Sequence, residues 1–135
     1  MKKRIAALIL LVLLASGCKR LPEMDASYGE EAVAAAAQEI VALANAGDYE
    51  SICGLIRTDL KASITPEALK DAWGPTMEAA GDFVETGKLS FYGTDDPATG
   101  ESYATVILSA RYAHKQLTYT LSFDHALNVV GLYLK

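Results

Sequence analysis

The spacing of apolar residues changes at Gly81, and this change constrains the fold more than any other feature of the sequence. From Glu30 to Ala80, apolar residues recur every three or four positions, which is the spacing of amphipathic helices. After Gly81 they recur at every second position, which is the spacing of half-buried strands. Helices followed by strands predict an α+β domain, in which the helices cover one face of a sheet.

Three helices are expected before Gly81. The first ends near Gly47, because glycine readily adopts the left-handed conformation at a helix end. Asp48 is suited to cap the second helix, which is expected to run as one amphipathic segment. Its inward residues are Ile52, Leu55, Ile56 and Leu60. Thr65-Pro66-Glu67 begins the third helix, which is expected to kink or restart at Pro75 because proline lacks an amide hydrogen.

Four strands are expected after Gly81, at residues 83–92, 101–112, 117–124 and 130–134. The connections between the last strands are short, which predicts an antiparallel meander, because parallel strands would need helical crossovers. The outward face of this sheet is expected to be polar. It carries Thr105, Ser109, Arg111, Thr118 and Thr120. Such a face suits pairing of modest strength, so a homodimer joined through the sheet is one structural hypothesis.

The N-terminus has the pattern of a bacterial export signal. Lys2, Lys3 and Arg4 precede an apolar run at 5–14, which is about half the roughly 20 residues that a spanning helix needs. Residues 14–18, Leu-Ala-Ser-Gly-Cys, resemble a lipobox, although Ala15 stands where leucine is usual. The resemblance implies cleavage after Gly17, transfer of diacylglycerol to Cys18, and anchoring on the outer side of the cell or outer membrane. The alternative is an ordinary secretory leader that leaves Cys18 free.

The predicted organisation is a signal peptide at 1–17, a lipidated cysteine and tether at 18–29, and one domain at 30–135. The tether is expected because residues 19–29 show no apolar period. The net charge is −5, and it falls near −8 when the leader's three basic residues are removed. A domain this acidic repels phosphate backbones, which argues against a nucleic-acid partner. Contact with the membrane must therefore come from the lipid.

Short segments resemble a bacterial family of small exported proteins of unknown function, whose domain also precedes some α/β-hydrolases. They are AAAAQEIVALANAGDYESI at 34–52, residues 64–73, Gly81-Asp82-Phe83, and the ending at 124–133. This family resembles the nuclear transport factor 2-like, or cystatin-like, superfamily, in which a bent sheet wraps a long helix into a cone. The resemblance implies such a cone, which often holds a small ligand or pairs through its sheet. No Gly-x-Ser-x-Gly nucleophile turn accompanies it here.

No catalytic constellation, metal site or cofactor site is predicted. His114 and His125 fall in turns without zinc-ligand spacing, and the acidic loop at 95–101 lacks the alternating oxygens of a calcium loop. Cys53 is expected to be a small buried residue that forms no disulfide with Cys18. The alternative, a reactive thiol activated by Arg57, would require exposure and a basic environment.

Four aromatic residues are candidates for lining a ligand cavity with polar tips, and the alternative is that they fill the core. They are Tyr49, Trp73, Tyr103 and Tyr119. The predicted function is therefore a membrane-anchored binding domain for a small molecule or another envelope protein, not an enzyme. A small cavity enzyme, such as an isomerase, lyase or hydrolase accessory, and a structural dimerisation module are the alternatives.

Overall fold

The computed structural model describes residues 21–135, so the predicted leader, Cys18 and the first residues of the tether lie outside the described part. The helices are α2 (Glu30–Asn45), α3 (Tyr49–Gly54), the 3-10 helix η1 (Thr58–Ser63) and α4 (Pro66–Ala80). The strands are β1 (Phe83–Asp95), β2 (Ser102–Tyr112), β3 (Gln116–Phe123) and β4 (Val129–Leu134). Helices thus precede an antiparallel sheet, and the predicted α+β class is confirmed.

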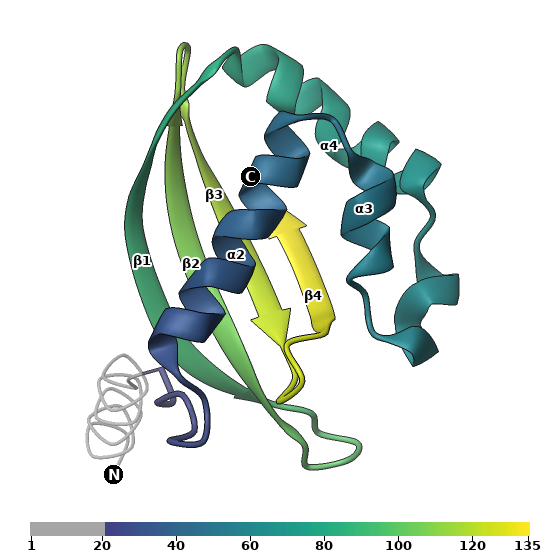
Figure 1. Ribbon diagram of the computed structural model, residues 1–135, viewed down its shortest axis with the longest axis vertical. Helices are drawn as coiled ribbons and strands as arrows, with labels where there is room; N and C mark the ends of the chain where they lie inside the picture. The colour runs from purple at the N-terminus through teal and green to yellow at the C-terminus, as the bar shows by residue number, and fades with distance from the viewer. Residues whose placement is uncertain (1–20) are drawn as a thin grey trace, which may run out of the picture.

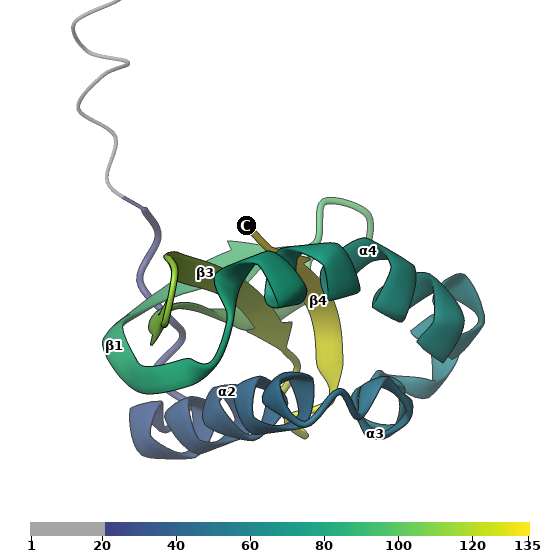
Figure 2. The same cartoon turned by 90° about the horizontal axis from the view of Figure 1, so that it is seen from above.

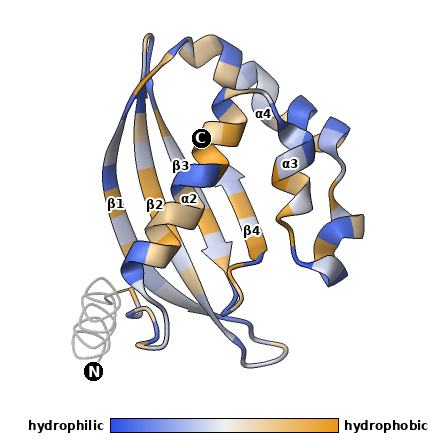
Figure 3. Ribbon diagram, viewed as in Figure 1, coloured by the Kyte–Doolittle hydropathy of each residue, from blue (hydrophilic) through white to orange (hydrophobic). Residues whose placement is uncertain are grey.

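The strands form a meander in the order β1-β2-β3-β4, with each strand antiparallel to its neighbour. The sheet is curved, and α2 and α3 lie on the same side of it (Figures 1 and 2). Along β3 every second residue from Leu117 to Phe123 is buried, while Thr118 and Thr120 are partly exposed. Along β2 residues 103–106 are all buried, and burial alternates from Ile107 to Tyr112. Figure 3 shows apolar segments in orange on β2 and on α2. One face of the sheet therefore forms the core, and the other is polar.

Small side chains on α2 let this helix lie close to the sheet. Ala37 and Ala44 are buried beside Val33 and Ile40, and all four belong to one hydrophobic core. Across the core, Trp73 of α4 meets Tyr119 of β3 edge to face, with ring centroids 5.7 Å apart. Aromatic pairs favour this arrangement because the positive edge of one ring faces the negative face of the other.

The second helix ends earlier than its spacing predicts. It stops at Gly54, and Ile56 leaves it to form a parallel bridge with Val129 of β4. The backbone N–H of Arg57 donates to Val129 O at 2.9 Å, and Val129 N–H donates to Leu55 O at 2.9 Å. These tertiary hydrogen bonds replace the intrahelical ones, so the prediction of one continuous helix to Leu60 is wrong.

The third helix does not restart at Pro75, where the sequence predicts an interruption. α4 runs from Pro66 to Ala80 as one element that contains Pro75. Pro75 and Asp71 are both exposed. The carbonyl of Asp71, whose intrahelical partner the proline removes, is therefore on the water-facing side of the helix, where losing that hydrogen bond costs little.

The described part of the predicted tether, residues 21–29, contacts the sheet. Gly93 N–H of β1 donates to Pro22 O at 2.8 Å, and the Tyr28 hydroxyl donates to Ser102 O at 2.7 Å. The Tyr28 ring is buried in the core. A Cβ at Gly93 would lie 2.5 Å from Glu23 O, so the absence of a side chain allows this close approach. Tyr28 therefore adds to the core a residue that the sequence places in the tether.

Replacing Gly93 with valine is expected to displace residues 22–28 from β1, because the new Cβ collides with the backbone at Glu23. Hydrogen exchange of the amides at 24–28 should become about tenfold faster or more, since their protection depends on this local contact. The control is Gly54→Ala, where an added Cβ meets nothing within 4 Å. Unchanged exchange in the Gly93 variant would show that the segment is held by Tyr28 alone.

Candidate functional site

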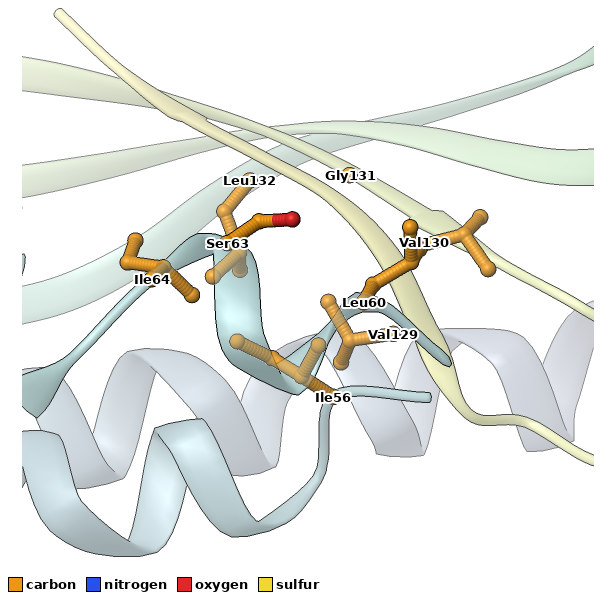
Figure 4. A pocket seen from close by; sticks show the side chains of 8 residues that line it. All are labelled: Ile56, Leu60, Ser63, Ile64, Val129, Val130, Gly131 and Leu132. Carbon is orange, nitrogen blue, oxygen red and sulfur yellow. The ribbon is translucent and has the colours of Figure 1, made fainter. Parts of the chain in front are cut away.

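An apolar groove lies between β4 and the segment from Ile56 to Ile64 (Figure 4). Its volume is about 190 Å³. The groove is lined by Ile56, Leu60, Ser63, Ile64, Val129, Val130, Gly131 and Leu132. Ser63 contributes a hydroxyl, and the other side chains are aliphatic apart from Gly131. This composition suits an apolar ligand and offers no acid or base for catalysis.

One wall of the groove is an open strand edge. Thr118 and Lys135 exchange two backbone hydrogen bonds, of 2.8 and 3.1 Å, so they form a hydrogen-bonded pair of the β3–β4 ladder. Antiparallel pairing alternates, and residues two positions apart along a strand behave alike. Leu134 and Leu132, which face Tyr119 and Leu121, therefore direct their N–H and C=O groups away from β3. The edge is occupied at Val129 by the bridge to Ile56 and is open beyond it.

A second opening, the tyrosine cleft, lies where α2 and α4 end. Both helix ends are toward the top of Figure 1. It is lined by Ala44, Asn45, Ala46, Gly47, Tyr49, Met77, Glu78, Gly81, Asp82, Phe83 and Tyr112. Its volume is about 470 Å³. The lining combines aromatic rings with two exposed carboxylates, so this cleft is more polar than the groove along β4.

A chain of hydroxyl groups runs from the tyrosine cleft into the core. The Tyr112 hydroxyl donates to Asn45 Oδ1 and lies 2.7 Å from the Tyr119 hydroxyl, which approaches Met77 Sδ at 3.4 Å. Burial raises the pKa of both phenols above the usual value for tyrosine. The two side chains thus remain uncharged, and they satisfy each other's hydrogen bonds inside an apolar interior.

The four predicted cavity-lining aromatics are found in different places. Tyr49 lines the tyrosine cleft. Trp73 and Tyr119 pack against each other in the core, outside the openings described in residues 21–135. Tyr103 lies beside Arg57, and its ring centroid is 5.5 Å from the guanidinium carbon. The fold therefore places Tyr49 at an opening, uses Trp73 and Tyr119 to fill the interior, and separates Tyr103 from the rest.

Arg57 forms an ionic cluster that fastens η1 to the sheet. Its guanidinium donates to Asp59 at 2.8 Å, to Glu101 at 2.7 Å and to the Tyr103 hydroxyl at 3.3 Å. Asp124 lies 3.8 Å away and accepts backbone hydrogen bonds within the β3–β4 turn. The hydrogen bond from Arg57 lowers the pKa of Asp59. Because every charge here has a partner within the protein, the cluster is best explained as structural.

Ser27, His125 and Asp25 form a contact that sequence reasoning missed. Ser27 Oγ lies 2.8 Å from His125 Nε2 and donates to Asp25 Oδ1 at 2.6 Å. A catalytic serine must give its single proton to the histidine, whereas here it gives it to the carboxylate. His125 also stacks on Tyr28, with centroids 4.2 Å apart. These contacts fasten residues 25–28 to the β3–β4 turn. They do not form a catalytic pair, because the serine does not donate its proton to the histidine.

Two kinds of feature are absent from residues 21–135. No group of three or more histidine, cysteine or carboxylate side chains lies close enough to hold a metal ion there. None of the helices in that part is both long and apolar enough to cross a bilayer. Cys53 is partly buried, and burial raises the pKa of its thiol, which disfavours the reactive thiolate.

The comparisons with known proteins agree with this fold. Residues 37–132 match the family described as "Protein of unknown function (DUF3887)". An NMR structure of a protein from Ruminococcus gnavus ATCC 29149 is 29% identical in sequence, with a TM-score of 0.75. The match covers 84% of this chain and 96% of that one. No curated protein matches the sequence.

Proposed function

Since this chain belongs to the DUF3887 family, whose function is unknown, we propose a role from its own geometry. The protein is an exported lipoprotein, anchored through Cys18, whose domain binds an extended apolar segment of another envelope protein along β4. The observation that carries the binding role is an apolar groove that adjoins an open strand edge.

The lipid anchor is supported by the lipobox-like motif and by the position of the described N-terminal residues. Four peptide units separate Cys18 from Pro22, and this stretch spans about 14 Å at most. Because Pro22 contacts Gly93 of β1, a lipid on Cys18 would hold the domain close to the membrane by that end. An anchored domain meets other envelope proteins more often than a free one, which suits a binding role.

Strand addition, in which a bound peptide extends the sheet beside β4, would use both walls of the groove. An extended peptide beside β4 would form hydrogen bonds with the outward N–H and C=O groups of Leu132 and Leu134. Every second side chain of the peptide would enter the groove and contact Ile56, Leu60 and Ile64. The backbone contacts supply affinity, and the groove selects apolar side chains at alternate positions.

The filled interior favours binding over catalysis. The arrangement of a curved sheet and a long helix supports a place among the cystatin-like or nuclear transport factor 2-like cones, and in such cones a reaction needs an acid or base directed into the cavity. Here Trp73, Tyr119 and Leu69 occupy the space between α4 and the sheet. Neither the groove lining nor these core residues provides a carboxylate or a histidine.

The proposal is tested with the full chain in a non-ionic detergent, labelled with ¹⁵N-leucine. Peptides of six residues with valine at alternate positions should slow hydrogen exchange at Leu132 and Leu134 at least about fivefold when bound, because both amides gain a partner. Exchange at Leu121, which is already inside the ladder, should not change. Peptides N-methylated at the bonding amides serve as the matched control and should bind more weakly.

A variant tests the contribution of the groove lining to peptide binding separately from that of the strand edge. Ile64→Asp places a charge in the apolar lining and should reduce peptide binding at least about tenfold, because an unpaired charge loses its hydration there. Lys88→Asp on β1 changes an exposed residue outside the groove and should leave binding intact. If neither Ile64→Asp nor N-methylation of the peptide changed the binding affinity, strand addition would be overturned.

A further inference from the structure

The tyrosine cleft lies in a negative electrostatic environment. The C-termini of α2 and α4 meet there, and each helix end carries roughly half a negative charge. Neither helix has a basic residue in its last turn. The lining adds the carboxylates of Glu78 and Asp82 and contains no lysine, arginine or histidine. His114 donates its backbone N–H to Ala80 O at 2.8 Å and is not part of the lining. Lys70 lines an adjoining hollow that shares Gly47 and Tyr49 with the cleft.

Aromatic rings form part of the same lining. Phe83 is 41% exposed, and it meets Tyr112 edge to face with centroids 5.5 Å apart. Tyr49 contributes a third ring. The faces of aromatic rings attract cations, and the attraction grows when the cation is partly removed from water.

Tyr49 supplies an unused polar group. The residue is only 8% exposed, and its hydroxyl makes no side-chain hydrogen bond within residues 21–135. Every side-chain oxygen or nitrogen that is fully buried in that part has a partner. The Tyr49 hydroxyl must therefore reach solvent, and the residue lines two openings, the tyrosine cleft and the hollow that Lys70 also lines. Burial raises the pKa of Tyr49, so the group stays a neutral hydroxyl that can accept a hydrogen bond.

We propose that the tyrosine cleft binds an alkylammonium group, carried by a small amine or by a lysine side chain. The N–H donors of the ammonium match the Tyr49 hydroxyl and the carboxylates of Glu78 and Asp82, and its alkyl chain matches the exposed ring of Phe83. A metal ion is less suited, because residues 21–135 bring no three ligating side chains together. This site is separate from the groove along β4, because the two share no lining residue.

The site would also face away from the membrane. α2 has 16 residues and so spans about 24 Å, with the segment that follows Pro22 at its first end and the cleft at its last. In Figure 1 the start of α2 lies near the lower left, and the ends of α2 and α4, which line the cleft, lie toward the top. A domain anchored through Cys18 therefore presents the cleft to the aqueous side, where amines and lysine side chains are accessible.

The test uses the full chain in a non-ionic detergent, labelled with ¹⁵N-glycine and titrated with n-butylammonium. The amide resonances of Gly47 and Gly81, which line the cleft, should shift, and that of Gly100 should not. The neutral analogue n-butanol should bind at least about fivefold more weakly, because it lacks the charge. Nα-acetyl-lysine N-methylamide, whose side chain keeps its free ε-ammonium group beside two peptide bonds, distinguishes the two sources. Tighter binding than butylammonium would indicate a lysine side chain, and weaker binding would indicate a free amine.

Variants distinguish recognition from general attraction to an acidic protein. Glu78→Gln with Asp82→Asn should weaken butylammonium binding at least about threefold, since exposed charges contribute modestly. Tyr49→Phe keeps the ring and should also weaken binding, with little change in stability. The control, Glu39→Gln with Asp71→Asn, removes the same charge from exposed positions outside the lining and should bind normally. Equal binding of butanol, or equal weakening in both double variants, would overturn the proposal.

Discussion

Replacing Trp73 with alanine is expected to lower the free energy of unfolding by about 3 to 5 kcal/mol. The side chain is buried, and its removal leaves a cavity beside Tyr119 and takes away their edge-to-face contact. Small domains are stable by only about 5 to 15 kcal/mol, so this loss removes a large share of the total. Urea denaturation followed by circular dichroism measures it.

Trp73→Phe is the matched variant, because it keeps an aromatic ring against Tyr119 and leaves a smaller cavity. Its loss should be clearly smaller than that of the alanine variant. Ala72→Ser changes the exposed neighbour on the same helix and should have little effect. A loss below about 1 kcal/mol for Trp73→Ala would mean that the side chain does not close the interior as described.

Replacing Cys18 with serine is expected to abolish lipid labelling of the protein made in its own cells. Diacylglycerol transfer needs a sulfur nucleophile, and a serine hydroxyl does not replace a thiolate. Cells fed an alkyne analogue of palmitate should label the natural protein and not the variant. Cys53→Ser removes the other cysteine and should remain labelled, which makes it the matched control.

The strength of membrane binding follows from the length of the acyl chains. Each buried methylene contributes about 0.8 kcal/mol, so two acyl chains of ordinary length contribute on the order of 20 kcal/mol to membrane binding. The natural protein should therefore resist extraction by salt and alkaline carbonate and require detergent. An unlabelled natural protein would instead indicate an ordinary secretory leader that leaves Cys18 free.

Local patterns predicted the elements well where one physical preference dominated. Gly47 ends α2 and Asp48 caps α3, and Thr65 caps α4, because these choices depend on residues within one turn. The alternation from Leu117 to Phe123 predicted a strand with one buried face, and β3 has it. The short connections predicted the antiparallel meander for the same local reason.

Long-range contacts account for what local patterns missed. Ile56 has helical spacing, yet its bridge to Val129 draws it out of the helix, and these two residues are distant in sequence. Ser27 and His125 are in contact although they are 98 residues apart in sequence, and no short motif predicts such a pair. The candidate sites depend on the same kind of contact. The tyrosine cleft joins the ends of α2 and α4, and the groove along β4 joins Ile56 and Leu60 to Leu132.

The sequence by itself determined the order of helices and strands, the buried faces of β2 and β3, and the acidic character of the chain. These properties follow from side-chain spacing and charge, which a linear pattern contains. Only the tertiary structure decided that Trp73 and Tyr119 fill the interior while Tyr49 reaches an opening, and that residues 22–28 lie against β1. Apolar aromatic residues look alike in a sequence, and the space left over after packing determines which of them meets solvent.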